Sequence, residues 1–172
     1  MPIKIIDTVD LEKIISELLL LEKIPDITKH SVNGDEDFQY LLQGSNESIE
    51  INGTTRLIDG KAVESSFILD LYSDLMPYTY MVINEFQLIR TRALTLQPKT
   101  CYSYHVDGTQ RIHIPITSNE NCFMVIDDKV YRMPADGSIY MVDTTKMHTA
   151  INANRNWFNR MHLVGAISYK PS

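Results

Sequence analysis

The amino-acid sequence predicts a mainly β fold, a jelly-roll or cupin-like barrel with flanking N-terminal helices. Two observations carry this prediction. From residue 90 onward, short segments rich in β-forming residues follow one another and are separated by turn residues. Before residue 90, two longer segments carry apolar residues at helical spacing. The length of 172 residues fits a single domain, 1–172, in which residues 1–89 form a helical and mixed part packed on a jelly-roll core of residues 90–172.

The first predicted helix follows from apolar residues that repeat every three or four positions, at Leu11, Ile14, Ile15, Leu18 and Leu19. Three polar residues before this run offer caps: Asp7, Thr8 and Asp10. Pro25 ends the run, because proline interrupts helical hydrogen bonding.

A second helix is predicted around residues 75–86, where apolar residues again mark one face. Pro77 is compatible with this helix if it lies in the first turn, after Ser73 or Asp74 as the cap. Since both helices are amphipathic, we expect them to pack on the outside of one sheet.

Eight short strands are predicted in the second half of the chain, at residues 90–97, 100–107, 111–117, 121–127, 129–133, 138–143, 148–152 and 158–168. Turn residues such as Asp107-Gly108 and Asp136-Gly137 lie between them. Eight short strands of this kind are typical of a jelly roll. A further pair of strands, at 48–51 and 55–58, is predicted to meet in a turn at Asn52-Gly53.

Composition excludes several classes of protein. The net charge of -6 argues against general nucleic-acid binding, which needs a basic face. No segment approaches the ~18 consecutive apolar residues of a membrane span, and the N-terminus lacks the apolar core of a signal peptide. We therefore expect a cytoplasmic protein that does not bind membranes. Its two cysteines, Cys101 and Cys122, form no metal-binding or redox motif and are expected to be reduced thiols.

Three residues form a candidate metal site: His105, Asp107 and His148. His105 and Asp107 are two positions apart in a predicted strand end, so their side chains point the same way. His148 follows another predicted strand and begins the next, from where strand pairing would bring it to the same point. Two histidines and one carboxylate are the facial ligand set of non-haem Fe(II) oxygenases. Taken alone, the His-x-Asp pair is better explained as a strand end and an Asp-Gly turn, so the prediction depends on His148 and on the arginines.

Arg160 strengthens the prediction because of its place in the last predicted strand. Alternation puts it on one face with His162, Val164 and Ala166. An arginine that points into an apolar interior needs an anionic partner, and a dicarboxylate would supply one. Arg111 and His113 repeat the Arg-x-His pattern in an earlier strand.

The remaining arginines of this half are interpreted differently. We expect Arg90, Arg92, Arg132 and Arg155 to be exposed charges that keep sheet edges from pairing with other chains.

Together these stretches resemble the aspartyl/asparaginyl β-hydroxylase-like branch of the 2-oxoglutarate/Fe(II) oxygenases. The matching segments are LTLQPKTCYSYHVD, RIHIPITSNENCFMVID, GSIYMVDTTKMHTAINA and NRMHLVGAIS. The order of His-x-Asp, Arg-x-His-x-Pro, a His before Asn, and Arg-x-x-Leu-Val is more specific than any single piece. The N-terminal half shows no such match.

The resemblance implies a double-stranded β-helix with iron bound by His105, Asp107 and His148. It implies that Arg160 binds the distal carboxylate of 2-oxoglutarate, and that Arg111 and His113 help to hold this cosubstrate. The implied activity is a dioxygenase that uses Fe(II), 2-oxoglutarate and O2 to hydroxylate an unactivated C–H bond. The implied substrate is an amino acid or a peptide residue of the Asp, Asn or Pro type.

Three other classes remain open from the sequence. A cupin-like metalloprotein without 2-oxoglutarate would share the barrel and the histidines but would not need Arg160. A catalytically inactive jelly-roll binding module would share only the fold. A halide- or phosphate-binding structural protein is supported only by the scattered arginines. Substrate contacts are expected from residues 31–66 and from the loop at residues 152–156, and the apolar strand residues are expected to keep water from the site.

Overall fold

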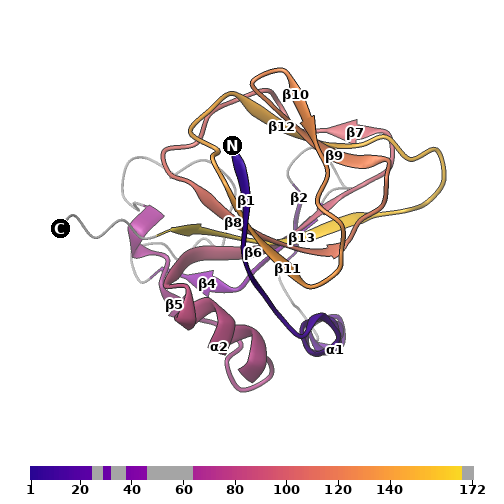
Figure 1. The fold of residues 1–172 in the computed structure, drawn as a ribbon. Helices are drawn as coiled ribbons and strands as arrows, with labels where there is room; N and C mark the ends of the chain where they lie inside the picture. The colour runs from indigo at the N-terminus through magenta and orange to yellow at the C-terminus, as the bar shows by residue number, and fades with distance from the viewer. Residues whose placement is uncertain (25–28, 32–37, 46–63, 168–172) are drawn as a thin grey trace.

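A large antiparallel sheet forms the middle layer of the molecule (Figure 1). The computed structural model describes residues 1–24, 29–31, 38–45 and 64–167. In the order in which they pair, the strands of this sheet are β1 (Ile3–Thr8), β11 (Ser138–Val142), β8 (Arg111–Thr117), β13 (Arg160–Ile167), β6 (Leu88–Leu96), β3 (Phe38–Leu41) and β2 (Lys29–Ser31).

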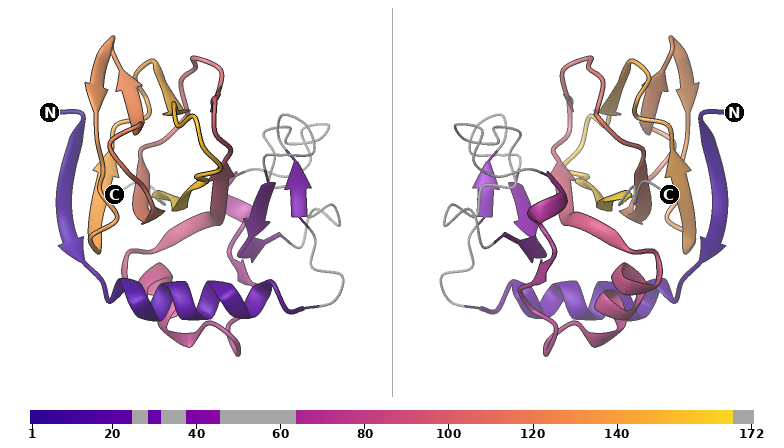
Figure 2. Two further views of the ribbon diagram at one scale, coloured as in Figure 1. Left: turned by 90° about the vertical axis from the view of Figure 1, so that its right-hand side faces the viewer. Right: turned by 90° about the vertical axis from the view of Figure 1, so that its left-hand side faces the viewer.

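A smaller sheet lies on one side of the large one and the helices lie on the other (Figures 1 and 2). Its strands, in pairing order, are β10 (Lys129–Tyr131), β9 (Cys122–Ile126), β12 (His148–Asn152) and β7 (Thr100–Cys101). The strands β4 (Gln43–Gly44) and β5 (Leu69–Asp70) pair separately, and the short 3-10 helix η2 spans Glu64–Ser66.

The predicted mainly β fold is confirmed, with a correction to the barrel. The described residues contain two α-helices, α1 (Leu11–Leu21) and α2 (Pro77–Glu85), and every described strand pair is antiparallel. Among the described strands, however, the two sheets remain separate and do not close into a barrel. None of the helices described is long and apolar enough to cross a membrane. Both cysteines are free thiols.

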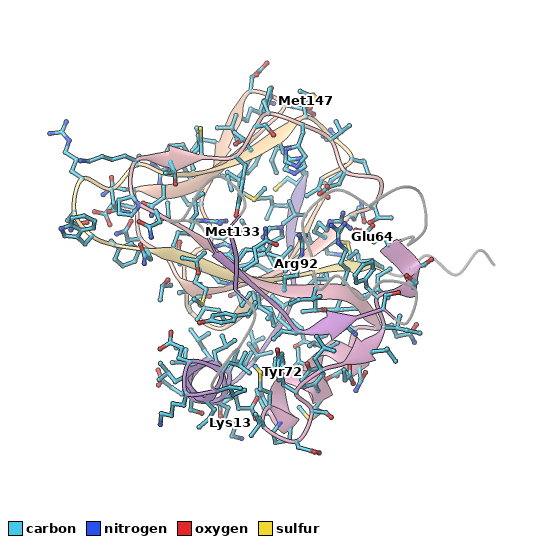
Figure 3. All side chains as sticks on the ribbon, turned by 180° about the vertical axis from the view of Figure 1, so that it is seen from behind. Lys13, Glu64, Tyr72, Arg92, Met133 and Met147 are labelled. Atoms are coloured by element: carbon cyan, nitrogen blue, oxygen red, sulfur yellow. The ribbon has the colours of Figure 1, made fainter. Side chains whose placement is uncertain are left out.

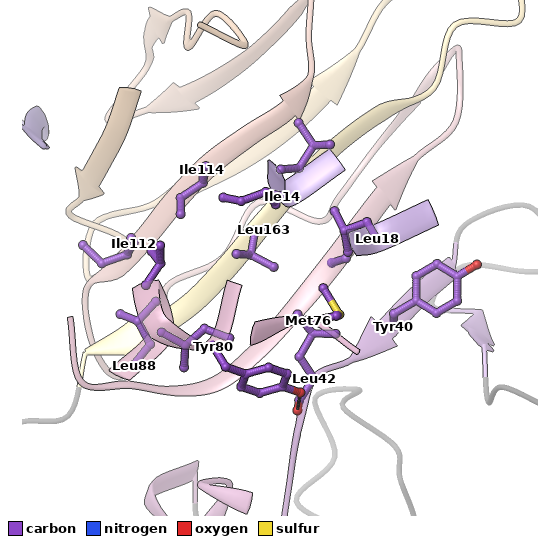
Figure 4. Close-up of a cluster of buried hydrophobic side chains, with 14 of the residues drawn as sticks. Ile14, Leu18, Tyr40, Leu42, Met76, Tyr80, Leu88, Ile112, Ile114 and Leu163 are labelled. Carbon is purple, nitrogen blue, oxygen red and sulfur yellow. Dashed lines mark hydrogen bonds between the residues drawn. The ribbon is translucent and has the colours of Figure 1, made fainter. Parts of the chain in front are cut away.

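The two faces of the large sheet differ in chemistry. In β8, six consecutive residues are buried, because both faces of the strand are covered. Ile112 and Ile114 of β8 and Leu163 of β13 face the helices. They belong to one hydrophobic cluster with residues of both helices (Figure 4). Arg111 and His113 alternate with these isoleucines and face the small sheet. The sheet therefore presents an apolar face to the helices and a partly polar face to the space between the sheets.

Helix α1 follows the predicted pattern. Ile14, Leu18 and Leu21 are buried in the cluster on the large sheet, as expected for one face of an amphipathic helix. Asp10 is the N-cap, and its carboxylate accepts a hydrogen bond from the backbone N–H of Lys13 at 3.3 Å. Packing of the helices on the outside of one sheet is thus confirmed.

Pro77 lies in the first turn of helix α2, as expected, but it is the first residue of the helix and the predicted cap is wrong. Its N-cap is Met76, which makes no side-chain capping bond. The cap comes from α1 instead. The carboxylate of Glu17 accepts hydrogen bonds from the backbone N–H groups of Tyr78 and Thr79, both at 2.8 Å, and from the Thr79 hydroxyl at 2.6 Å. A negative charge at a helix N-terminus also meets the positive end of the helix dipole.

Glu17→Gln is expected to destabilise the fold by about 1–3 kcal/mol, because a buried charge-assisted cap is replaced by a neutral group that leaves donors poorly paired. Urea unfolding measures the effect. Glu22→Gln, at the exposed C-cap position of the same helix, is the control and should change the free energy of unfolding by less than about 0.5 kcal/mol. Equal effects of the two substitutions would show that Glu17 does not join the helices.

The strand predictions were right for seven segments and wrong for one. Strands β6 and β8 to β13 lie where they were expected. The segment 100–107 was predicted as one strand, but only Thr100 and Cys101 pair as a strand, and His105 forms an isolated bridge further on. The predicted strands at 48–51 and 55–58 lie outside the described residues. Strands β1, β2 and β3 were not predicted, so the N-terminal part extends the large sheet at both edges as well as covering it.

Candidate metal centre and cosubstrate pocket

The two candidate histidine ligands are direct partners across an antiparallel bridge. The N–H of His105 donates to the carbonyl of His148 at 3.0 Å, and the N–H of His148 donates back at 2.8 Å. Opposed residues of such a pair project to the same face, and the ring centroids lie 4.4 Å apart. Backbone pairing between distant segments therefore creates the pair, although His105 lies outside a regular strand.

Each ring is held with one particular nitrogen toward the partner ligands. Nδ1 of His105 lies 2.7 Å from the carbonyl oxygen of Ser103, and Nδ1 of His148 lies 2.9 Å from that of Lys146. A carbonyl oxygen only accepts, so both Nδ1 atoms carry a proton, and Nε2 is the nitrogen of each ring that can bind a metal. Burial lowers the pKa of His148, which favours its neutral form. This arrangement is the one that metal-binding histidines need.

Asp107 completes a cluster of candidate metal ligands with His105 and His148, here called the metal cluster. Its Oδ1 lies 3.9 Å from Nε2 of His105, and its Oδ2 lies 3.7 Å from Nε2 of His148. The backbone N–H of Asp107 donates to the carbonyl of Thr144 at 2.8 Å, and this bond fixes the turn. Ligand atoms of the three residues all lie within 4.8 Å of one another. The structure thus brings together the three residues that the sequence singled out.

These residues fit an Fe(II) ion. Two imidazole nitrogens and one carboxylate oxygen converge from one side, and both imidazoles direct Nε2, not the hydrogen-bonded Nδ1, toward Asp107. Such a set satisfies half of an octahedral coordination shell and leaves positions for exogenous ligands.

A cavity of about 440 Å³ opens beside the cluster, between the two sheets. Its volume lies in the range of small-molecule binding sites. Its walls combine apolar strand residues with charged and aromatic ones; they include Gln39, Arg92, Tyr102, Arg111, His113, Met124, Arg160 and Val164. All three residues of the metal cluster also line it.

Arg160 lines this cavity from β13 and is only 3% exposed. Burial lowers the pKa of its guanidinium to about 10, which leaves it charged at neutral pH. Nη2 of Arg160 lies 3.2 Å from Nδ1 of His162. Among the residues that the structure describes, no carboxylate pairs with Arg160. The wall of the cavity therefore carries the buried guanidinium cation of Arg160, which is suited to an anionic ligand.

Two further histidines, His113 and His162, lie near Arg160. Nδ1 of His162 lies 3.4 Å from Nδ1 of His113. Burial, and then the charge of Arg160, lower the pKa of both rings well below the ordinary value, so both are neutral. Since Arg160 donates to Nδ1 of His162, His113 must be the donor in the contact between the rings. His113 lines the cavity, as predicted; its contact with the cosubstrate stays a prediction.

Arg111 also lines the cavity, but its guanidinium is occupied by the chain itself. Nε donates to Oδ2 of Asp107 at 3.2 Å, Nη1 donates to the Thr109 hydroxyl at 2.6 Å, and Nη2 lies 2.8 Å from Oε1 of Glu64. These contacts direct Arg111 toward carboxylates of the protein. Its expected contact with the cosubstrate stays a prediction.

The interpretation of Arg90 and Arg92 as edge charges is wrong. Strand β6 lies between β13 and β3, inside the large sheet. Arg92 lines the cavity, Nη1 donates to Oε1 of Gln39 at 3.0 Å, and burial lowers its pKa to about 9. Arg90 is 8% exposed and pairs with Glu64 at 3.1 Å. Arg132 and Arg155 are exposed, as expected.

The loop at 152–156 does not line the cavity, contrary to expectation. The amide of Asn152 donates to the carbonyls of Leu96 and Phe158 at 2.9 and 2.8 Å, and Asn154 bonds to Asn119. These buried amides hold the chain between β12 and β13.

Residues 31–66 contribute two residues of interest, Gln39 and Glu64, in the part that the structure describes. No motif marked Glu64 in the sequence, because its partners are distant along the chain.

A metal cluster of two histidines and a carboxylate between antiparallel sheets, with a cationic pocket beside it, defines the class of non-haem iron oxygenases. Comparison with known families agrees: the sequence model of the aspartyl/asparaginyl β-hydroxylase family matches residues 66–168. The chain belongs to this family, and it is a 2-oxoglutarate-dependent hydroxylase that uses Fe(II) and O2.

Solved structures share the fold at low sequence identity. A Pseudomonas putida prolyl-4-hydroxylase superposes with a TM-score of 0.52 at 10% identity, and the match covers 98% of this chain and 93% of that one. An oxidoreductase of the 2OG-Fe(II) oxygenase family from Burkholderia pseudomallei gives a TM-score of 0.52 at 14% identity, with 90% and 78% coverage. A search of curated proteins finds no significant match.

Proposed function

We propose that this hydroxylase acts on a free amino acid or a short peptide, with His105, Asp107 and His148 as its iron ligands and Arg160 as the anchor of 2-oxoglutarate. One observation carries the proposal. The same cavity is lined by three convergent ligand residues and by a buried arginine that no described carboxylate neutralises. A 2-oxo acid with a second carboxylate suits both features.

The iron, when bound, supplies the O2 activation that couples decarboxylation of 2-oxoglutarate to insertion of one oxygen atom into a C–H bond. The balanced reaction converts 2-oxoglutarate, O2 and R–H into succinate, CO2 and R–OH. His105 and His148 contribute neutral nitrogens whose orientation is fixed by the carbonyls of Ser103 and Lys146. Asp107 contributes the negative charge that favours a divalent cation.

The rest of the cavity orients the reactants and keeps water away. Arg160 can bind a carboxylate through two parallel N–H groups, and His162 accepts from its Nη2 and so helps to set the plane of the guanidinium. Met124, Ala150 and Val164 supply apolar wall. Neutral His113 and His162 add no competing charge beside Arg160.

The size of the cavity supports a small substrate. About 440 Å³ must hold 2-oxoglutarate and the reacting part of the substrate together. The strand-rich half and the helices share one hydrophobic cluster, which supports a single domain. No observation on the described residues favours a metalloprotein that works without 2-oxoglutarate or an inactive binding module.

The test is a product assay with Fe(II), 2-oxoglutarate and O2 against panels of free amino acids and short peptides. We expect succinate to form in equal amounts with a product that gains one oxygen atom. Hydroxylation of folded protein substrates alone would refute the proposed substrate size. Hydroxylation that proceeds without 2-oxoglutarate would refute the role given to Arg160.

A further inference from the structure

Glu64 lies at the centre of an ionic network that reaches the metal cluster from the N-terminal part of the chain. Its Oε1 lies 2.8 Å from Nη2 of Arg111 and 3.1 Å from Nη1 of Arg90, and its Oε2 accepts from the Thr109 hydroxyl at 3.3 Å. The network joins η2 to strands β6 and β8, which β13 separates in the sheet. In Figure 3, Glu64 and Arg92 are labelled between Met147, near the top, and Tyr72 and Lys13, near the bottom, where the helices lie.

The carboxylate of Glu64 remains charged in this setting. Its side chain is 20% exposed and that of Arg111 is 7% exposed. Burial by itself would raise the pKa of Glu64, but the charges of Arg111 and Arg90 outweigh burial and hold the pKa below its ordinary value. The Coulomb attraction in an ion pair that is this little exposed to solvent is much stronger than in an exposed ion pair.

Arg111 connects Glu64 to the metal cluster. Nη2 is bound to Glu64 and Nη1 to Thr109, so only Nε is directed at Asp107, where it donates to Oδ2 at 3.2 Å. An arginine without these restraints could turn its fork toward Asp107 and bind both carboxylate oxygens, a geometry that arginine and carboxylate favour. That pairing would compete with a metal ion for Asp107.

We infer that Glu64 is a positioning residue for the iron site: it restrains Arg111 so that Asp107 keeps an oxygen available to the metal, and it offsets the charge of Arg111 near a dication. This inference rests on the proposed role of Asp107 as a ligand. Glu64 lies before residues 66–168, the segment matched by the family model. The restraint therefore comes from a part of the chain that the family pattern does not include.

Glu64→Gln tests the inference, because glutamine keeps the size of the side chain and removes its charge. Mn(II), which resists oxidation, is titrated by calorimetry into the metal-free protein. We expect the dissociation constant to rise by about 10–100-fold, the usual effect of removing a residue that orients a metal ligand. Glu85→Gln, an exposed substitution with the same change of charge, should leave it unchanged.

A double-mutant cycle with Arg111→Gln separates positioning from general loosening of the fold. If Glu64 acts through Arg111, Glu64→Gln should weaken Mn(II) binding by less than about threefold in the Arg111→Gln background, well below its ~10–100-fold effect alone. The electron paramagnetic resonance spectrum of bound Mn(II) should also change in Glu64→Gln, since the ligand arrangement changes. A fall in melting temperature with unchanged affinity and spectrum would overturn the inference.

The wild-type protein and Asp107→Ala distinguish the two levels of the proposal. Failure of the wild-type protein to bind Mn(II), or equal binding by Asp107→Ala, would refute the metal site itself. Tight binding by the wild type, weak binding by Asp107→Ala and wild-type affinity in Glu64→Gln would refute the role of Glu64 alone.

Discussion

Asp107→Ala is expected to abolish tight Fe(II) binding, with a dissociation constant raised by more than the ~10–100-fold typical of residues that only orient a ligand. The substitution removes the one carboxylate of the cluster and leaves the two imidazoles. It also leaves Arg111 with its charge directed at the site. Anaerobic titration of Fe(II) into the metal-free protein measures the effect.

The variant should remain folded, because Arg111 keeps its contacts with Glu64 and Thr109. Asp74→Ala, at an exposed position before α2, serves as the control and should bind Fe(II) as the wild type does. Asp107→Asn adds a sharper comparison, since it keeps the shape and the acceptor for Arg111 but not the charge. Wild-type affinity in both Asp107 variants would show that the carboxylate is not a ligand.

Arg160→Ala is expected to raise the 2-oxoglutarate concentration required for turnover while Fe(II) binding is kept. Removing one partner of a buried charge pair costs about 2–5 kcal/mol, which corresponds to a ~30- to 5000-fold weaker interaction. Steady-state kinetics with varied 2-oxoglutarate measures the change. Arg160→Lys should recover only part of it, because an ammonium group lacks the two parallel donors of the guanidinium.

Two controls make this result specific to the cosubstrate. Arg155→Ala removes an exposed arginine from the loop before β13 and should leave the requirement unchanged. Fe(II) titration of Arg160→Ala should match the wild type. Loss of iron binding in Arg160→Ala would show that the residue supports the structure of the site rather than the cosubstrate.

Most of the strand-rich half could be predicted from the sequence, because each strand is short, rich in β-forming residues and bounded by turns. Strand β1 could not, since its burial pattern shows no strict alternation and it is held by pairing with β11 at the sheet edge. The cap of α2 was missed for a related reason. The accepting carboxylate, that of Glu17, lies about sixty positions away and acts only after the helices have packed.

The metal cluster could be predicted because two histidines and one aspartate are residue types that typically bind Fe(II). The reason given for its geometry was only partly right: His105 and His148 meet through an isolated bridge rather than through a regular strand at 100–107. Arg92 was misjudged because alternation alone does not say which face of a strand is covered. Glu64 could not be found, since its role depends on contacts among three segments far apart in the chain. The cytoplasmic location stays a prediction.

We propose that one cavity of the protein binds Fe(II) and 2-oxoglutarate together. Anaerobic titration of 2-oxoglutarate into the Fe(II)-loaded protein tests it most directly, through the weak visible charge-transfer absorption of an iron-bound 2-oxo acid. We predict that this absorption appears and saturates in the wild type, requires far more 2-oxoglutarate in Arg160→Ala, and is lost in Asp107→Ala. Absence of the band in Fe(II)-loaded wild-type protein, together with no succinate on exposure to O2 and candidate substrates, would contradict the account.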